Sequence, residues 1–368
     1  MARVAVVASA TSAFVKQSDQ SVAELAAGPC AEILRSNPVL RELVDCVLVS
    51  SCSNEQYLGP VVSEMLGIQP KLAQRIDNLC NSGTNSIATG FSLIASGLCS
   101  AVLVTGAEKR ESTGYRLTSD ITRGSYFLPV HWAALFAKSY MRKYQLAEEK
   151  LAMVPVLNRK NSAKNPKALF PSEVTVDQVM NSRKIVEPLK LLECSSACDG
   201  ASAVMLLSEK LARQVPSTPV WISGIGQRTN SASLAGSTPE LSRIDSAIHA
   251  GRDAFEMAGL RPSDVDVAEL HDAFSILEIM ALEDLGLAVA GKGSRFLETG
   301  DTVLNPRGGI LGCGHPVGAT GIAQVAEIFS QLSHKAGERQ VSSTLKCGLV
   351  HNLAAAGSSA TVMIMSAN

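Results

Sequence analysis

The stretch Asp77-Asn-Leu-Cys80-Asn-Ser-Gly-Thr-Asn-Ser86 places a single cysteine directly before a segment with helical periodicity. Apolar residues then recur at the spacing of one helix face, which predicts a helix over 87–98. This apolar stripe consists of Ile87, Phe91, Ile94 and Leu98. The residues between them are mostly small, so other elements can approach closely on every side, and we expect a buried helix.

Cys80 has two interpretations. A thiol at the first turn of a helix lies near unpaired backbone N–H groups and the positive end of the helix dipole. Both effects favour the thiolate, which is the nucleophilic form of cysteine. A free cysteine is also commonly a buried residue that only fills space. Position alone leaves both interpretations open.

The composition is typical of a compact soluble enzyme with two domains of ordinary size. The chain has 368 residues, is 46% hydrophobic and 18% charged, and carries a net charge of -1. Without a surplus of Lys and Arg, nucleic-acid binding has little support. Nine cysteines without paired spacing indicate reduced thiols rather than disulfides. Cys194 and Cys198 have no second pair of ligands beside them, so no metal site is predicted.

The sequence contains no membrane-spanning segment. The short run Met1–Ala10 has one positive charge and is rich in Val, so a first strand fits it better than a signal peptide. No stretch approaches the roughly 18 apolar residues that span a bilayer. A cytoplasmic protein is expected.

The first half alternates strand and helix signals. Strands are predicted at 4–8, 46–50, 101–105 and 201–207, and helices at 21–36, 58–66 and 87–98. Short apolar strands rich in β-branched residues, separated by helices, indicate a sheet covered on both faces. From about 111 to 190 the chain is richer in charge and proline, with one amphipathic helix at 132–143. This segment is expected to be a loop excursion that covers the site.

The second half repeats the first. The strand at 220–224 resembles that at 4–8, the stretch 265–272 parallels 44–51, and 360–366 parallels 201–208. A repeat of this length predicts an α/β fold of two duplicated domains, 1–215 and 216–368, related by a pseudo-twofold axis. The counterpart of the Cys80 helix is then 318–332, and Gly314-His315-Pro316 directly precedes it.

Three histidines of the second half lie where a strand yields to a loop, which is the usual place of chemistry in α/β folds. They are His271 in Glu269-Leu-His-Asp-Ala-Phe274, His315 among six glycines, and His351 in Gly348-Leu-Val-His-Asn352. A single histidine is more often a structural hydrogen-bonding residue than a catalyst. The glycines around His315 favour a ligand site, because they permit close backbone approach.

These motifs together resemble the thiolase family over nearly the whole chain. The Cys80 loop resembles the nucleophile loop, His271-Asp-Ala-Phe resembles the Asn-Glu-Ala-Phe loop, and Gly314-His315-Pro316 resembles the Gly-His-Pro loop. The stretches 135–165 and 199–204 also resemble the family. His271 in place of Asn, and His351-Asn352, are similar to the archaeal-type and sterol-carrier-protein-type branches.

The resemblance implies a thiolase fold and acyl transfer from a CoA thioester, with no tightly bound cofactor. It implies Cys80 as the nucleophile, His315 as its base, and His315 with His271 as one oxyanion hole. It further implies a second hole, formed by the backbone N–H groups of Cys80 and Ala355. It also implies a homodimer or tetramer, with 101–105 as a plausible contact region, and in the archaeal-type branch a small OB-fold, zinc-ribbon partner.

One departure from the thiolase pattern leaves the type of reaction open. Degradative thiolases carry a second cysteine whose place falls here on Leu353, and the sterol-carrier type keeps it where this chain has Ala273. Cys313 and Cys347 do not match either position. His351 or Cys313 would then replace the missing acid/base. The alternatives are a decarboxylating ketoacyl-synthase-like enzyme, transfer to an acceptor other than CoA, or a non-catalytic subunit of a complex.

Overall fold

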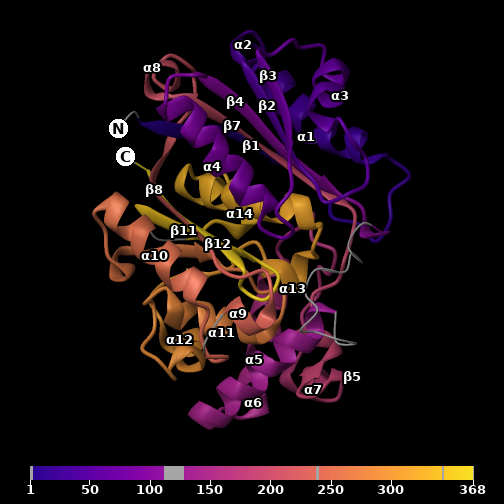
Figure 1. The fold of residues 1–368 in the computed structure, drawn as a ribbon, viewed down its shortest axis with the longest axis vertical. Helices are drawn as coiled ribbons and strands as arrows, with labels where there is room; N and C mark the ends of the chain where they lie inside the picture. Colours follow the sequence, from indigo (N-terminus) through magenta and orange to yellow (C-terminus); the bar gives the residue numbers. More distant parts are fainter. Residues whose placement is uncertain (1–2, 112–127, 238–239, 342–343, 368) are drawn as a thin grey trace.

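The strands of the two halves form one continuous sheet. The computed structural model describes residues 3–111, 128–237, 240–341 and 344–367, and within them the sheet has ten strands in the order β10-β9-β11-β12-β8-β1-β7-β4-β2-β3. β1 (Val4–Thr11) and β8 (Val220–Thr229) pair at its centre. Figure 1 shows the strands of the first half above those of the second.

Both halves have the same strand succession. The first contains β2 (Cys46–Ser50), β3 (Leu72–Ile76), β4 (Ala101–Glu108) and β7 (Gly200–Ser208). The second contains β9 (Val267–Glu269), β10 (Val303–Leu304), β11 (Cys347–Ala354) and β12 (Ser359–Ser366). From the centre outward, neighbouring strands of each half pair antiparallel twice and then parallel twice. The predicted α/β duplication is confirmed, and its matched segments are equivalent strands.

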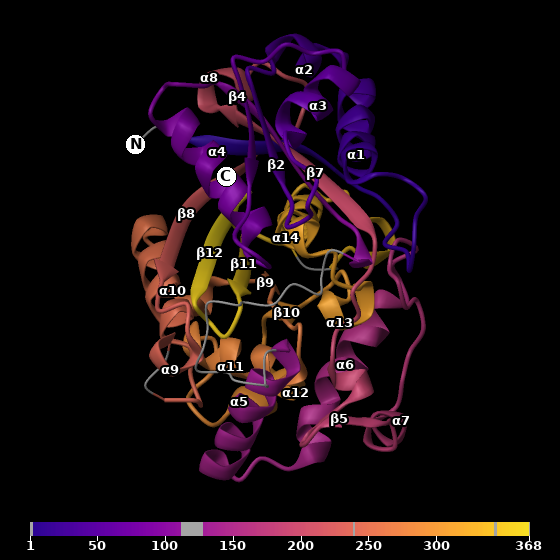
Figure 2. The ribbon, with the colours of Figure 1, turned by 45° about the vertical axis from the view of Figure 1, so that its right-hand side comes forward.

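The helices cover both faces of the sheet, as predicted. On the outer face of the first half lie α1 (Val22–Ser36), α2 (Pro38–Leu43) and α3 (Leu58–Met65). On the outer face of the second lie α10 (Asp245–Ala258) and α11 (Ser275–Asp284). Between the halves lie α4 (Ser82–Ala95) and α14 (Val317–Leu332). Figure 2 shows α14 between the strands of the two halves, and α4 packs against it.

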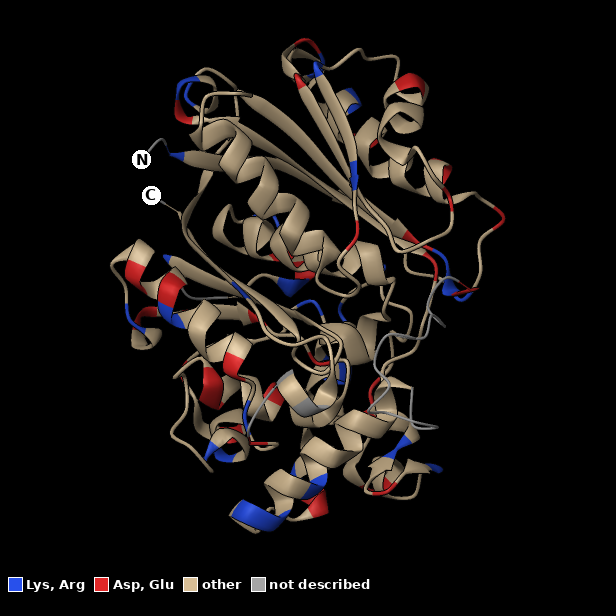
Figure 3. Ribbon diagram, in the orientation of Figure 1, with Lys and Arg blue, Asp and Glu red and all other residues tan. Residues whose placement is uncertain are grey.

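Strand alternation explains this layering. In β1, Val4 and Val6 join the central apolar cluster, whereas Ala5 and Val7 join the outer one. Successive side chains of a strand point to opposite faces, so an apolar strand buries both of its faces. Figure 3 shows α4 without a single charged residue along its length. Such a helix is stable only in the interior.

The predicted end of the Cys80 helix is wrong at Leu98. Helix α4 begins earlier, at Ser82, and ends at Ala95. Gly97 then takes a positive φ of 79°, which turns the chain out of the helix. Leu98 is 68% exposed and does not belong to the buried stripe.

The excursion contains more structure than the one predicted helix. It comprises α5 (Pro129–Tyr144), α6 (Glu148–Ser162), α7 (Val176–Met180) and the hairpin of β5 (Lys184–Val186) and β6 (Leu189–Lys190). Helix α6 is hidden in the sequence because it buries the polar residues Asn158, Arg159 and Ser162 and has Pro155 in its interior. Periodicity of apolar residues cannot detect a helix of this kind.

The remaining elements are short. They are the helices α8 (Glu209–Ala212), α9 (Leu234–Ser237), α12 (Gly293–Thr299) and α13 (Gly309–Cys313), and the 3₁₀ turns Leu191–Glu193, Pro262–Asp264 and Gly337–Arg339. The division of the chain at 215/216 stays a prediction. Among the described residues, no helix has the length and apolar composition that crossing a membrane requires.

Candidate active site

Cys80 lies in the loop between β3 and α4, two residues before the helix begins. Leu79 has a positive φ of 50°, which turns the chain sharply ahead of the cysteine. Ser82 Oγ accepts a hydrogen bond from the backbone N–H of Asn78 at 2.6 Å and donates one to the carbonyl of Leu79 at 2.6 Å. Ser82 therefore links the residues before and after Cys80 and fixes the conformation of the loop around the thiol.

The second half of the chain holds the same loop in place. The amide groups of Asn78 and Asn81 both donate to Ser359 Oγ at the start of β12, at 3.1 and 2.8 Å. Asn85 donates to Thr361 Oγ1 at 3.0 Å. The position of Cys80 therefore depends on contacts across the duplicated halves.

His315 lies at the start of α14, the counterpart of α4. Gly314, with φ of 91°, turns the chain between α13 and α14, and the His315 N–H donates to the Ser196 carbonyl at 2.8 Å. The two central helices touch through their backbones, because a Cβ on Gly83 would lie only 2.9 Å from the Ile322 nitrogen. This close approach brings the two helix starts together.

The ring of His315 joins Cys80 to Thr320. Its Nε2 lies 3.4 Å from Cys80 Sγ, and its Nδ1 lies 2.8 Å from Thr320 Oγ1. Thr320 already donates its hydroxyl proton to the Pro316 carbonyl at 3.0 Å, so it accepts from His315. The proton of the neutral ring is then on Nδ1, and Nε2 presents a lone pair to the thiol.

His271 completes the group. It follows β9, is buried, and its ring centroid lies 5.5 Å from that of His315 in an edge-to-face arrangement. One donor atom from each of Cys80, His271 and His315 lies within 4.8 Å of the other two. His271 Nδ1 is buried and has no hydrogen-bond partner in the described part of the chain.

The thiol of Cys80 is neutral in this environment. Burial raises the pKa of Cys80 to about 12, and the charge of Glu108 raises it further. The backbone N–H groups of Cys80 and Ala355 lower this pKa, but not enough to offset burial. The expectation that the helix start favours the thiolate therefore fails in the resting state, because desolvation outweighs the N–H groups.

Ala355 lies in the turn between β11 and β12 with a positive φ of 50°. This left-handed conformation is uncommon for a residue with a Cβ. The Ala355 N–H lowers the pKa of the Cys80 thiol. Two backbone N–H groups, those of Cys80 and Ala355, thus converge on one sulfur.

His351 lies close by but outside the group of three. It is buried in β11, and neither ring nitrogen has a hydrogen-bond partner among the described residues. Burial lowers the pKa of His351 to about 4. β9 and β11 pair in parallel with Glu269 opposite Val350, so His351 lies on the strand next to the one that His271 follows.

No second cysteine of the described chain joins this group. Leu353 is buried in β11 opposite Ala360, and Ala273 is buried beside His271. Cys313 donates to the Arg307 carbonyl at 3.0 Å, away from the group of three. Cys347 begins β11, six residues before Leu353. Cys52 Sγ lies 3.6 Å from Ser82 Oγ, and Cys198 Sγ would meet a Cβ on Gly314, but neither thiol belongs to the group of three.

A buried polar network behind His271 was missed in the sequence. Asn158 Nδ2 donates to Asp272 and to Glu278, both at 2.7 Å, and Asn305 donates to Glu278 at 2.9 Å. Asp272 also accepts from the N–H of Ile310 at 2.6 Å. The network joins α6 of the excursion to the loops that carry His271 and His315. Its only sequence signal is the polar character of 158–162.

Arg307 was also missed. It is buried, its Nε lies 3.6 Å from Glu269 Oε2, and its Nε and Nη2 make no hydrogen bond within the described chain. Burial raises the pKa of Glu269 to about 8, so this carboxyl is protonated near neutral pH. Burial, with the Arg307 charge as a second cause, lowers the pKa of His315 to about 4. Arg307 therefore helps to keep His315 neutral.

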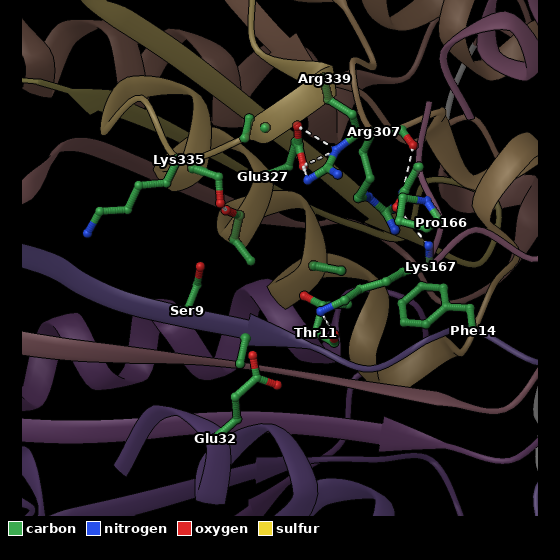
Figure 4. Close-up of a pocket in the computed structure, with 17 residues that line it drawn as sticks. Ser9, Thr11, Phe14, Glu32, Pro166, Lys167, Arg307, Glu327, Lys335 and Arg339 are labelled. Atoms are coloured by element: carbon green, nitrogen blue, oxygen red, sulfur yellow. Dashed lines mark hydrogen bonds and ion pairs between the residues drawn. The ribbon is translucent and has the colours of Figure 1, made fainter. Parts of the chain in front are cut away.

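Arg307 also lines a cavity of about 270 Å³, together with Ala323, Ala326 and Glu327 of α14. Figure 4 shows Arg307 and Lys167 on one side of this cavity and the ion pair of Glu327 with Arg339 above it. None of the five predicted site residues, Cys80, His271, His315, His351 and Ala355, lines it. The cavity is distinct from the predicted site.

Comparison with known protein families shows to which family the chain belongs. The model of the thiolase N-terminal domain matches residues 4–210, and a model described as "Thiolase C-terminal domain-like" matches residues 226–367. The chain belongs to the thiolase family. The predicted resemblance and the predicted enzyme class, a thiolase-type acyltransferase, are confirmed.

The similar proteins include both predicted branches. An acetyl-CoA acetyltransferase of Methanothermobacter thermautotrophicus is 38% identical over 327 residues, which are 85% of this chain and 84% of that protein. Sterol carrier protein 2 of Oryctolagus cuniculus is 36% identical over 314 residues, which are 78% of this chain but only 57% of that protein.

A solved structure shows the same fold. The "Ltp2-ChsH2(DUF35) aldolase" superposes with a TM-score of 0.89, covering 99% of this chain and 98% of that one, at 24% identity. At this level of identity, the likeness concerns the fold alone.

Proposed function

We propose that this thiolase transfers an acyl group from a CoA thioester by way of a thioester on Cys80. The observation that carries the proposal is the 3.4 Å contact between Cys80 Sγ and His315 Nε2, with Thr320 holding the other ring nitrogen. A thiol whose pKa is raised by burial needs such a base to become a nucleophile.

In the first half-reaction the Cys80 proton moves to His315 Nε2, and the sulfur attacks the carbonyl carbon of the acyl-CoA. The bond from that carbon to the CoA sulfur breaks, and His315 returns the proton to the departing thiolate. The N–H groups of Cys80 and Ala355 stabilise the oxyanion of the enzyme thioester. His271 donates to the oxygen of the second bound thioester, because His315, once it has returned its proton, again has only a lone pair on Nε2.

The second half-reaction needs a base for the acceptor. We assign this role to His351, because both of its ring nitrogens lack partners among the described residues and it lies on the strand next to the one that His271 follows. Cys313 fits less well, because its thiol is buried and donates to the Arg307 carbonyl. A neutral imidazole with a lone pair is chemically able to accept the acceptor's α-proton.

A decarboxylating condensation is the second candidate. It is favoured by the Cys-His-His group itself, which has Ala273 and Leu353 where other thiolases have an acid/base cysteine. Loss of CO₂ from a malonyl-type acceptor generates the carbanion without proton abstraction. In that reaction His351 would not be needed as a base.

Mass spectrometry of the protein after incubation with labelled acetyl-CoA tests the proposal. We expect one acetyl group on Cys80, lost in Cys80→Ser and kept in Cys194→Ser, whose half-exposed thiol is a matched control. The absence of an adduct with every acyl-CoA tried would favour the non-catalytic subunit. Thiolysis of acetoacetyl-CoA, compared with condensation of malonyl-CoA, then distinguishes the two candidate reactions.

A basic groove supports CoA as the carrier. It lies on α5, has a volume of about 530 Å³, and is lined by Leu135, Lys138, Arg142, Lys143 and Leu241 among others. Lysine and arginine side chains over a partly apolar floor suit the phosphates and adenine of CoA. We therefore place the CoA tail along α5.

We further propose a homo-oligomer. The predicted contact at 101–105 is wrong, because β4 is buried between β7 and β2. The edge strand β3, half-exposed along most of its length, suits pairing with a second copy. A small partner subunit of the OB-fold, zinc-ribbon type also stays a proposal, supported by the two-component title of the aldolase structure. The cytoplasmic location stays a prediction.

A further inference from the structure

The three side chains at the start of α4 and α14 form a set of metal donors. One sulfur and two imidazole nitrogens lie within 4.8 Å of one another. Tetrahedral zinc, with bonds of about 2.3 Å to sulfur and about 2.05 Å to nitrogen, holds such a pair of ligands about 3.6 Å apart. Cys80 Sγ and His315 Nε2 are 3.4 Å apart, which is already close to that spacing.

The surroundings prepare both histidines for this role. The hydrogen bond of His315 Nδ1 to Thr320 fixes the ring and leaves Nε2 free, as an outer partner of a zinc-bound histidine does. His271 is only 1% exposed, and its buried Nδ1 has no partner in the described chain. A buried polar atom of this kind usually binds something.

The donor set selects the class of metal. One thiolate with two imidazoles favours Zn²⁺ and excludes Mg²⁺ and Ca²⁺, which prefer oxygen ligands. Cys80 is partly exposed, so a fourth position remains for water. Among the described residues, no other three His, Cys, Asp or Glu side chains form such a group.

We propose that Cys80, His271 and His315 bind one Zn²⁺ ion and that acylation of Cys80 is blocked while the ion is bound. Binding breaks the S–H bond of Cys80, forms a sulfur–zinc bond and releases the proton to solvent, without electron transfer. Metal binding needs only the positions of the three donors. The block of acylation rests on the proposed function.

Cobalt reports on this site independently of activity. We expect Co²⁺ to bind the full-length, reduced protein at one ion per chain, with the near-ultraviolet charge-transfer band of a cobalt thiolate, and Zn²⁺ to displace it. Cys80→Ser should remove the band. His271→Asn and His315→Asn should weaken binding by more than about 100-fold, because even outer-shell partners contribute about 10–100-fold. Cys194→Ser should bind as the unaltered protein does.

Alkylation provides a second measurement that does not depend on variants. Zn²⁺ should protect Cys80 from iodoacetamide and leave Cys194 reactive, and a chelator should restore both alkylation and acetylation of Cys80. The proposal is overturned if no thiolate band forms, if the band survives in Cys80→Ser, or if Zn²⁺ leaves Cys80 alkylation unchanged. Cobalt binding without acetylation in the metal-free protein would reject the proposed function and retain the metal site.

Discussion

At the scale of single residues, Thr320 decides which nitrogen of His315 faces Cys80. Its hydroxyl donates to the Pro316 carbonyl and accepts from His315 Nδ1, and it is fully buried. A residue that only filled space here would not fix the tautomer. Thr320 is therefore a positioning residue, which acts through His315.

Thr320→Val should slow acylation of Cys80 by about 10–100-fold, a part of the factor that a positioned general base contributes. Valine keeps the shape but cannot accept from Nδ1, so the proton is no longer held on that nitrogen. Quenched-flow mass spectrometry of acetyl-Cys80 measures the rate. Thr320→Ser retains the hydroxyl, so this variant should keep most of the acylation rate of the unaltered protein. Equal rates for the valine and serine variants would contradict the role.

Glu193, at the end of the 3₁₀ turn that directly follows the excursion, should make stability depend on pH. Burial raises its pKa from 4.5 to about 7. Between these values the folded protein holds a proton that the unfolded chain has lost, so stability falls as pH rises through this window and is constant above it. Its Oε1 has no hydrogen-bond partner among the described residues, whereas Oε2 accepts from the Lys190 N–H at 2.8 Å.

Glu193→Gln should therefore be more stable than the unaltered protein at pH 8, by about 1–3 kcal/mol, and equal to it near pH 4.5. Glutamine keeps the acceptor for Lys190 and removes the charge. Urea unfolding at both pH values measures the difference. Glu173→Gln, at an exposed position of the excursion, is the control and should show no gain. A gain of the same size at both pH values would exclude the ionisation as its cause.

At the scale of elements, the contact between α4 and α14 sets the distance between thiol and imidazole. Gly83 faces the backbone of Gly321 and Ile322, and Gly321 faces the backbone of Thr84. Side chains at these positions would separate the two helices. Since Cys80 and His315 lie directly before them, the catalytic contact follows from this close approach.

Gly83→Ala should lower the free energy of unfolding by about 1–3 kcal/mol and slow acylation of Cys80. The added Cβ would meet the Ile322 nitrogen at 2.9 Å, so the helices must move apart. Denaturant unfolding and the acylation rate are the two measurements. Gly28→Ala in α1, where a Cβ meets nothing within 4 Å, is the matched control and should stabilise by about 0.5–1 kcal/mol. An unchanged acylation rate in a destabilised Gly83→Ala protein would separate packing from catalysis.

At the scale of the whole molecule, the two halves share one interior. The central apolar cluster takes residues from β1, β4 and β7 of the first half and from β8, β11 and β12 of the second, with α4 and α14 between them. Neither half can bury the inner face of its strands alone. The duplicated halves are therefore expected to unfold together.

Differential scanning calorimetry of the full chain should show a single transition, with the calorimetric enthalpy equal to the van't Hoff enthalpy. The physical reason is that loss of one half exposes the central helix of the other. Two resolved transitions, or a calorimetric enthalpy well above the van't Hoff value, would mean that the halves are independent units.

Much of the fold could be predicted because its signals are local. Apolar strands such as Cys46–Ser50 indicate a sheet that is buried on both faces, and the small residues after Cys80 indicate an interior helix. The internal repeat then gave the pairing of the two halves. Helix α6 was not predicted because it buries Asn158, Arg159 and Ser162 beside its apolar residues, and Leu98 was assigned wrongly to the helix because α4 ends at Ala95 and Gly97 turns the chain away.

The sequence by itself determined the family, the duplicated α/β fold and the motifs that contain Cys80, His271 and His315. Only the tertiary structure decided how these residues meet: the 3.4 Å contact, the tautomer held by Thr320, and the charge of Arg307 near His315. The physical reason is that distance, desolvation and proton position depend on segments hundreds of residues apart. Cys80 and His315 are separated by 235 positions, and only the packing of α4 against α14 makes them neighbours.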